Sequence, residues 1–228
     1  MAKKQNNLTS RTKLEEVNES LSTAAQKLES NKKYIYWVAG AAAVIVLLVV
    51  GYIYGIRQPG IEKAKEAIGK ADIELLLRGN DSTALAAYEK VEKEYNYKPA
   101  ERAALSSAII LYRQGKYKEA ATKLENYDPH GDLVGPAAQS LLGDCYVNLD
   151  QLDKALAAFD KAITLTNNNE LYAPTFMMKK ATVLHAKKNY AEEAAIYQKI
   201  KDEYPNFVNQ NRIFIDKYIE RANALAGK

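Results

Sequence analysis

Three side chains in this sequence are of types that can do chemistry: His130, His185 and Cys145. A nucleophilic or metal site needs such groups clustered with carboxylates or further ligands at a fixed spacing. His130 lies in the turn-rich stretch DPHGD, and His185 lies in a helical stretch without Cys, Asp or Glu at metal-ligand spacing nearby. Cys145 directly precedes a large aromatic residue, which is typical of a buried apolar thiol. We therefore expect structural or surface roles for all three.

Other signatures of catalysis are also missing from the sequence. It has no Gly-rich loop that could cradle a phosphate and no nucleophile elbow. A lone cysteine excludes an internal disulfide and a Cys-rich zinc site. We expect a protein that is not an enzyme and has no cofactor, no metal site and no catalytic residue. The alternative, a membrane-tethered hydrolase, would need a clustered polar site that the sequence does not show.

The composition is that of a helical protein. Gly (11) and Pro (6) are sparse among 228 residues, and Ala, Leu, Glu and Lys dominate. The formal net charge is only +4. Residues 57–228 carry 25 basic and 24 acidic side chains, so they lack the positive surface that tracks nucleic-acid phosphates. A nucleic acid is therefore not an expected partner.

Residues 34–56, YIYWVAGAAAVIVLLVVGYIYGI, contain no charged side chain. At about 1.5 Å per residue this helix reaches roughly 34 Å, enough to cross a hydrocarbon core of about 30 Å. Aromatic residues stand at both ends, as in the aromatic belts of membrane interfaces. A signal peptide fits poorly, because the run is long, follows a polar tail and lacks a small-x-small cleavage pattern. The sequence predicts a transmembrane helix that is retained.

The flanks of this segment predict its orientation. Seven basic and four acidic residues precede it, and Lys27, Lys32 and Lys33 stand close to its edge. Beyond it, basic residues are interleaved with acidic ones. The positive-inside rule then favours a cytoplasmic N-terminal tail (1–33) and an exported domain. The RQPG stretch has turn chemistry and predicts a short linker within residues 57–64, where the next helix starts.

Beyond the linker, the sequence contains an internal repeat. The stretch AYEKVEKEYN (87–96) has a near-copy, IYQKIKDEYP (196–205), 109 residues further on. Small or apolar residues recur at mostly the same distances after each of four starting positions. Four units therefore fill residues 65–205 at spacings of 35 to 38. The starting positions are Asp72, Ala108, Gly143 and Ala181. In the clearest unit the pattern is Leu142, Gly143, Tyr146, Ala155, Phe159 and Ala162.

This pattern predicts stacked pairs of antiparallel helices. Small residues such as Gly143 and Ala155 let two helices approach closely, and large ones such as Tyr146 and Phe159 fill the gaps between pairs. No pair can bury its apolar face alone, so stacking supplies the core.

Two short stretches predict turns within pairs, RQGKY (113–117) and AKKNY (186–190). After Pro205, apolar residues at helical spacing, Ile213 and Ile215 among them, predict a capping helix over residues 206–228.

The offsets resemble the signature of the tetratricopeptide repeat family: Leu-Gly, then Tyr, then Ala and Phe, then Pro. The resemblance covers residues 65–205 and is strongest in 136–169. It implies an all-α fold in which the transmembrane helix precedes an α-solenoid of about four helix pairs and a capping helix. Asp72 and Glu193 depart from the pattern, since both replace small residues. Their units then pack more loosely, or the last unit shifts its register to use Ala194.

In this family the first helix of each pair lines a concave groove, so the resemblance implies a scaffold that binds a protein segment. Alignment places these residues on the groove: Arg102, Leu105, Ile109, Tyr112 and Arg113; Asp144, Val147 and Asn148; Met178, Thr182 and His185. The mix of Arg, Tyr, Met and aliphatic side chains suits an extended or helical peptide. The Lys/Asn clamp for a C-terminal carboxylate is absent, because Gly69 and Ile73 occupy its places in the first unit. A receptor for chaperone tails is therefore not expected.

The N-terminal tail carries an apolar stripe at three-four-three-four spacing: Leu14, Val17, Leu21, Ala24 and Leu28. Two heptads of this kind suit a short dimer seam, a membrane-surface helix or a docking helix. Gly51 and Gly55 form a Gly-xxx-Gly at the edge of the span, where the motif is a weak signal for helix dimers. A homodimer is thus one of the arrangements left open.

A cytoplasmic tail, one uncleaved span and an exported repeat domain resemble the single-pass repeat proteins of Gram-negative inner membranes. The best-understood of those are ancillary subunits of the Sec translocon that contact periplasmic chaperones. The resemblance implies an inner-membrane location, translocon or chaperone partners, and a role in protein translocation or envelope protein assembly. No residue motif here is specific to the translocon. An organelle import receptor with cytosolic repeats, in the inverted orientation, is the alternative.

Overall fold

The computed structural model describes residues 17, 21–22, 29–95 and 98–227, and every regular element in them is helical. The chain divides into two compact units, Met1–Pro59 and Gly60–Lys228. Of the apolar stripe in the tail, Val17 and Leu21 are helical and exposed. Its other members, Leu14, Ala24 and Leu28, lie outside the described residues.

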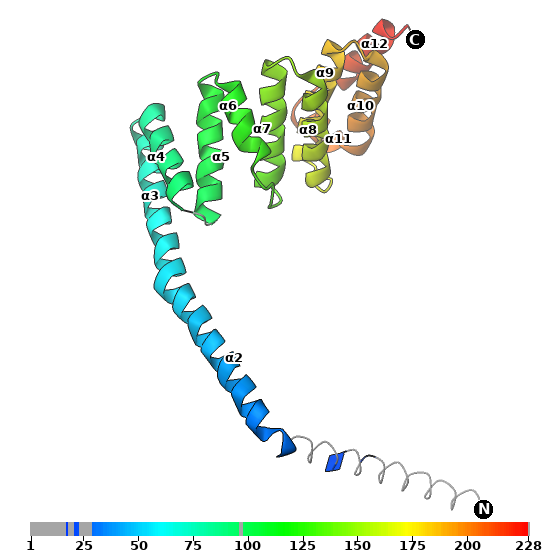
Figure 1. Ribbon diagram of the computed structural model, residues 1–228. Helices are drawn as coiled ribbons and strands as arrows, with labels where there is room; N and C mark the ends of the chain where they lie inside the picture. Colours follow the sequence, from blue (N-terminus) through cyan, green and yellow to red (C-terminus); the bar gives the residue numbers. More distant parts are fainter. Residues whose placement is uncertain (1–16, 18–20, 23–28, 96–97, 228) are drawn as a thin grey trace, which may run out of the picture. The chain divides into compact units, whose positions relative to one another are not determined.

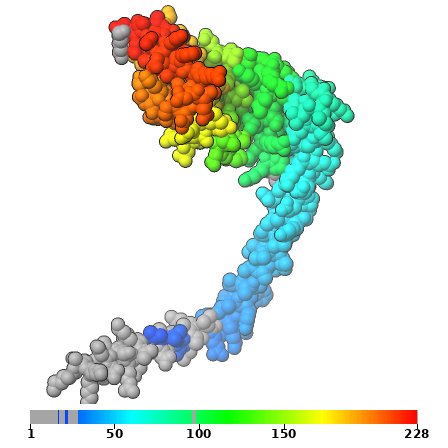
Figure 2. Space-filling view, turned by 180° about the vertical axis from the view of Figure 1, so that it is seen from behind, coloured from blue at the N-terminus to red at the C-terminus, as the bar shows by residue number. Residues whose placement is uncertain are grey.

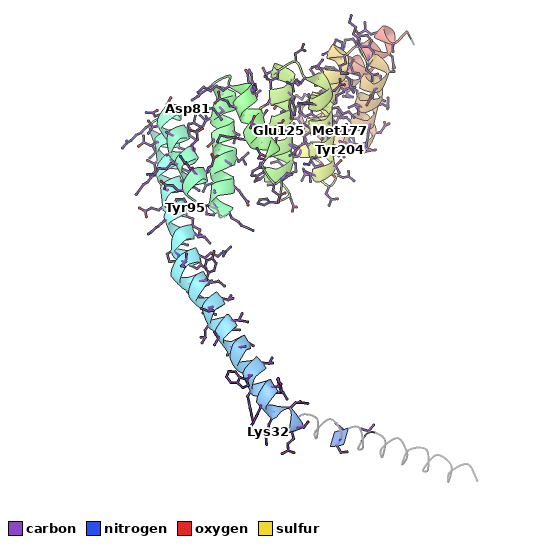
Figure 3. All side chains as sticks on the ribbon, in the orientation of Figure 1. Lys32, Asp81, Tyr95, Glu125, Met177 and Tyr204 are labelled. Atoms are coloured by element: carbon purple, nitrogen blue, oxygen red, sulfur yellow. The ribbon has the colours of Figure 1, made fainter. Side chains whose placement is uncertain are left out.

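The first unit holds helix α2 (Lys32–Tyr52), which starts at the Lys32 labelled in Figure 3, and the π-helix η1 (Ile53–Arg57). Neither element has a buried residue, and Trp37 is 81% exposed. By length and composition alone, the helical stretch Lys32–Leu77 could cross a membrane, and it is the one such stretch among the described residues. The apolar run predicted from the sequence is thus helical throughout and leaves its side chains uncovered.

The RQPG stretch is not a turn, so this part of the sequence prediction is wrong. Arg57 ends η1, and residues 58–60 open helix α3 (Gln58–Leu77). Inside an α-helix a proline has no N–H to donate, and its ring collides with the carbonyl four residues earlier. Here the Gln58 N–H bonds to the carbonyl of Ile53, five residues earlier. The wider π-helical turn therefore accommodates Pro59 without ending the helix.

Four helix pairs follow one another in chain order (Figure 1). The first pair is α3 with α4 (Asp81–Glu94), and the second is α5 (Lys98–Arg113) with α6 (Tyr117–Glu125). The third is α7 (Val134–Asn148) with α8 (Leu152–Leu165), and the fourth is α9 (Tyr172–Ala186) with α10 (Tyr190–Glu203). The prediction of an all-helical solenoid is confirmed.

Burial confirms the repeat offsets. In the third pair a Cβ atom added to Gly143 would lie 2.6 to 2.8 Å from ring atoms of Phe159, so only glycine fits there without a shift. Phe159 and Ala155 are themselves buried. At the same offsets in the other pairs, Asp72 and Leu75 of the first pair are half-buried. The remaining residues are buried: Ala84, Tyr88, Val91, Ala108, Leu111, Ala120, Leu124, Tyr127, Ala181, Leu184, Glu193, Tyr197 and Ile200.

The turns inside the last three pairs share one backbone geometry. A residue with positive φ follows the first helix in each: Gly115 (75°), Asp150 (56°) and Lys188 (59°). The next residue donates its N–H to the carbonyl five residues earlier, at 2.8 to 2.9 Å. This is the Schellman motif, which satisfies the last carbonyls of a helix. The two turns predicted from RQGKY and AKKNY are therefore confirmed.

Two helices, rather than the single predicted capping helix, follow the fourth pair: α11 (Pro205–Gln210) and α12 (Ile215–Leu225). Pro205 starts α11, because proline is tolerated at the first positions of a helix. Ile213 lies between the two helices. Helix α12 packs against α10, and Figure 2 shows it in red over the orange segment at the end of this unit. Met177 and Tyr204, labelled in Figure 3, share a hydrophobic cluster with residues of α10 and α12.

Candidate functional site

An apolar cavity of about 340 Å³ lies over the first helices of the second and third pairs and reaches the start of α9. Its lining residues are Leu105, Ile109, Leu133, Val134, Ala137, Ala138, Leu141 and Tyr172. Apart from the Tyr172 hydroxyl, every side chain in this lining is apolar. Ile109 is 40% exposed, Leu133 52% and Val134 48%. Large aliphatic side chains gathered around an open cavity mark a binding surface more often than singly scattered ones do.

The sequence of α5 explains why one face of this helix packs against the core and another lines the cavity. Ala103, Ile110 and Leu111 are buried against the core. Leu105 and Ile109, four residues apart, lie on another stripe of the same helix and line the cavity. Helix α5 thus packs and presents apolar side chains at once.

The loop before α7 completes the cavity. A Cβ atom added to Gly135 would lie 3.0 to 3.2 Å from backbone atoms of Pro129 and His130, so the loop packs tightly on the start of α7. This close approach fixes the place of Leu133, the last residue before α7. Repeat offsets could not predict Leu133 or Val134, because they lie between two units. The aliphatic pair directly before Gly135 was the signal that the sequence offered.

Of the predicted groove residues on α5, Leu105 and Ile109 line the apolar cavity, whereas the two arginines have partners in the first pair. Arg102 donates to Asp72 on α3 at 2.5 Å. Arg113 forms an ion pair with Asp81, labelled in Figure 3 at the start of α4. We expected both arginines on the groove, and the structure places them in ion pairs that tie the second helix pair to the first.

Tyr112 is half-buried against the core, with its ring edge-on to Tyr117 at 5.4 Å between centroids. Burial raises the pKa of the Tyr112 hydroxyl, with a further contribution from the carboxylate of Asp144. Tyr112, which the sequence predicts for the groove, therefore also fills space between helices.

The predicted groove residues on α7 and α9 include several that make polar contacts C-terminal to the residues that line the cavity. Lys179 of α9 donates to Asp144 at 2.5 Å and to Ser140 at 3.1 Å, which bridges the two first helices. Asn148 and Thr182 donate within their own helices, to the carbonyls of Asp144 (2.8 Å) and Met178 (3.1 Å). Val147 is 39% exposed. Lys179, which the repeat pattern did not single out, is the residue that joins these helices.

The two residues that depart from the repeat pattern, Asp72 and Glu193, are carboxylates that accept hydrogen bonds from other side chains. Glu193 is fully buried, and it accepts from His185 Nδ1 at 2.9 Å and from Arg221 at 2.9 Å. Its unit keeps the common register, so the predicted shift to Ala194 is wrong. In the first pair Asp72 accepts from the Tyr88 hydroxyl at 2.5 Å. His185 therefore holds α10 in place, where the sequence assigned it to the groove.

Cys145 is fully buried, and burial raises the pKa of its thiol to about 12. The burial confirms the prediction of a buried apolar thiol. Within the described part of the chain, no group of three or more His, Cys, Asp and Glu residues could hold a metal ion. Met178, the remaining predicted groove residue, lines a second cavity beside α12.

Comparison with known proteins agrees with this architecture. Models of the tetratricopeptide repeat match residues 74–129, 136–169 and 176–206. No curated protein matches the sequence. The crystal structure of the MamA protein superposes with a TM-score of 0.59 at 20% identity, over 73% of this chain and 84% of that one. YrrB, described as a tetratricopeptide repeat protein with an unusual peptide-binding site, superposes with a TM-score of 0.52 at 18% identity, over 74% of this chain and 91% of that one. The chain therefore carries tetratricopeptide repeats, stacked as an all-α solenoid.

Proposed function

We propose that this protein is a membrane-anchored, non-catalytic scaffold whose repeats bind a segment of another protein. The observation that carries the proposal is the apolar cavity between α5, α7 and the start of α9. A cavity of about 340 Å³ can accept one or two apolar side chains of a bound segment. YrrB, which shares the fold, is described as having a peptide-binding site, and this supports a peptide as the kind of ligand.

Polar groups on α7 and α9, C-terminal to the residues that line the cavity, suit the main chain of such a segment. The Asp144–Lys179 ion pair joins α7 to α9, and Asn148 follows one turn later on α7. An extended peptide with its apolar side chain in the cavity would offer N–H and C=O groups to such partners.

The proposed anchor is α2 with η1. Exposed aliphatic and aromatic side chains over 34–56 leave a surface that water would solvate at a high cost, and a bilayer core would cover it. The basic flank of the tail favours a cytoplasmic N-terminus, so we place the repeats on the exported face of a bacterial inner membrane. Translocon components and periplasmic chaperones are then the partner classes that we propose, in protein translocation or envelope protein assembly.

Photocrosslinking in cells tests the binding site. A photoreactive amino acid placed at Ile109 should give a discrete adduct with a partner protein, and Leu133→Asp should abolish it because the charge enters the apolar cavity. Lys161, exposed on α8, is the matched control position. Equal adducts from Ile109 and Lys161, or an Ile109 adduct that survives Leu133→Asp, would exclude this cavity as the binding site.

Protease protection tests the anchor and its orientation. Protease added to intact spheroplasts should digest the Gly60–Lys228 unit and spare the tail. Digestion of the repeats only after lysis would show the inverted orientation, which is that of an import receptor with cytosolic repeats. Recovery of the full chain in the soluble fraction after carbonate extraction would refute the anchor itself.

A further inference from the structure

The second cavity, of about 560 Å³, lies where α9 meets the connection between α11 and α12. Its lining residues are Met178, Asn211, Arg212, Ile213, Phe214, Lys217, Tyr218 and Arg221. Three of these side chains are cationic, and the lining contains no acidic residue. Its chemistry therefore differs from that of the apolar cavity between α5 and α7.

Among the described residues, two of the three cations have no carboxylate partner. Arg212 and Lys217 form no ion pair in the described part of the chain, and the neighbouring acid Asp216 pairs with Lys201 at 2.7 Å. Arg221 uses one nitrogen for the buried carboxylate of Glu193, at 2.9 Å. The cavity thus retains positive charge that no carboxylate of residues 29–95 and 98–227 neutralises.

Apolar surface lies directly beside this charge. Phe214 is 71% exposed, and Lys217 Nζ lies 5.0 Å from the centre of its ring. Tyr218 lies under the guanidinium of Arg221 at 5.5 Å, and Met178 closes the cavity from α9. A cation beside an open aromatic ring can bind a carboxylate and an apolar side chain of one ligand at the same time.

The backbone holds Arg212 in place. The φ angle of Arg212 is 51°, in the left-handed region that residues other than glycine rarely adopt. The N–H of Ile213 bonds to the carbonyl of Val208 at 3.0 Å, which closes α11 with the same motif as the turns inside the pairs. The side chain of Arg212 therefore starts from a fixed backbone position beside the cavity.

The geometry points to a second recognition site, which binds an acidic stretch of a protein segment with an apolar residue between its carboxylates. This inference rests on the proposed scaffold function and specifies the charge of its partner. A concavity lined by the rings of Phe214 and Tyr218 suits the side chains of a peptide better than it suits a planar lipid surface. Residues Arg212 and Lys217 bind the carboxylates, and Phe214, Tyr218 and Met178 contact the apolar side chain.

Fluorescence anisotropy with the detergent-solubilised full chain tests this site. The probe is a short fluorescein-labelled peptide in which Asp and Glu residues flank one Phe, and the reference peptide has Lys in place of the acids. The probe should bind more tightly than the reference, and its affinity should fall with added salt because exposed charges are screened. The double variant Arg212→Glu/Lys217→Glu should weaken binding of the probe by about tenfold or more. The matched double reversal Lys118→Glu/Lys161→Glu, on exposed residues of α6 and α8, should leave it unchanged.

Further arms identify the carboxylate and the ligand class. A probe with an amidated C-terminus that binds as well as the free acid assigns recognition to the side chains, and a loss of affinity assigns it to the chain terminus. Equal binding of the probe to wild type and the double variant, or no binding at about 1 mM protein, overturns the inference. The inference is also overturned if Arg212→Glu/Lys217→Glu abolishes sedimentation with anionic phosphatidylglycerol vesicles but leaves binding of the probe unchanged.

Failure of the inference is distinguishable from failure of the scaffold function. A crosslinked partner at Ile109 that persists in Arg212→Glu/Lys217→Glu, together with no probe binding, leaves the scaffold function standing without the acidic site. Loss of a specific adduct at Ile109 in the wild type removes the proposed function, whatever the probe does.

Discussion

The third and fourth helix pairs bury different residues at the same position of the repeat. In the third pair this position is Ala155, whereas in the fourth it is Glu193, and neither has any exposed surface. The third pair is followed by another pair, whose first helix α9 packs on α8. The fourth pair is followed by α12, whose Arg221 binds the buried carboxylate. The same backbone register therefore serves an apolar contact in one pair and an ionic contact in the other.

The difference shows what the end of the stack requires. A buried ion pair seldom stabilises a protein more than apolar packing of the same volume, but it costs several kcal/mol to break. It is also directional, because Glu193 accepts from His185 on one oxygen and from Arg221 on the other. We infer that the ionic contact selects α12 as the helix that closes the solenoid, whereas apolar contacts between the inner pairs supply most of the stability.

The largest expected effect comes from removing one partner of this contact. Arg221→Ala leaves a buried carboxylate with His185 alone and should lower the free energy of unfolding by about 3 kcal/mol, discounted from larger values because Arg221 is half exposed. Urea unfolding of the detergent-solubilised chain, followed by helical circular dichroism, measures it. The double variant Glu193→Leu/Arg221→Ala should recover most of the loss. A cost below about 0.5 kcal/mol for the single variant would show that the ion pair does not hold the cap.

A smaller effect is expected at the helix contact of the third pair. Gly143→Ala puts a methyl group where only 2.6 to 2.8 Å separates it from the ring of Phe159. Overpacking of this kind costs about 1–3 kcal/mol, and the gain in helix propensity returns up to about 1, so we expect a net loss of about 1–2 kcal/mol. In a Phe159→Leu background the ring is gone, so the further loss of stability caused by Gly143→Ala should be smaller than it is in the wild type. A Gly143→Ala protein as stable as the wild type would show that α7 and α8 are further apart.

The third pair should also respond to alkaline pH through Cys145. Burial raises the pKa of its thiol from about 9 to about 12, so the folded protein keeps a proton that the unfolded chain loses above pH 9. Stability from this group is present below pH 9 and is lost as the pH rises toward 12. Between pH 9 and 10 the wild type should lose about 1 kcal/mol more than Cys145→Ala, measured by urea unfolding at each pH. Parallel losses in the two proteins would contradict the burial of the thiol.

The stack and its register could be predicted from the sequence, because close helix packing constrains the residue types at each position. Gly143, Ala155 and Phe159 lie where their spacing put them. The ion pairs could not be predicted from that spacing. Glu193 departs from the pattern because it replaces a small residue. Its pairing could not be foreseen, because its partner Arg221 lies 28 residues further on, in a helix outside the repeat.

The candidate site was predictable only in part, for a related reason. Leu105 and Ile109 lie on the predicted face because the helix period fixes which face of α5 they occupy. Leu133 lies in a connection whose path depends on tertiary packing against Gly135. Arg102 and Arg113 lie on the right helix, but their long side chains reach carboxylates of the first pair. Helical periodicity predicts the face from which a side chain starts. It does not predict the partner that the end of a long, flexible side chain reaches.

The smallest effect is expected in the turns of the same two pairs, where Asp150 and Lys188 hold the positive-φ position. Aspartate tolerates the left-handed region better than lysine does, and glycine adopts it without a steric cost. Lys188→Gly should therefore stabilise the fourth pair by about 0.5 kcal/mol, because the relieved strain exceeds the added entropy of the unfolded chain. Asp150→Gly should gain less, and the difference between the two turns would appear as unequal shifts of the urea midpoint. If Lys188→Gly destabilises the protein, the lysine side chain makes a contact worth more than the strain that its backbone stores.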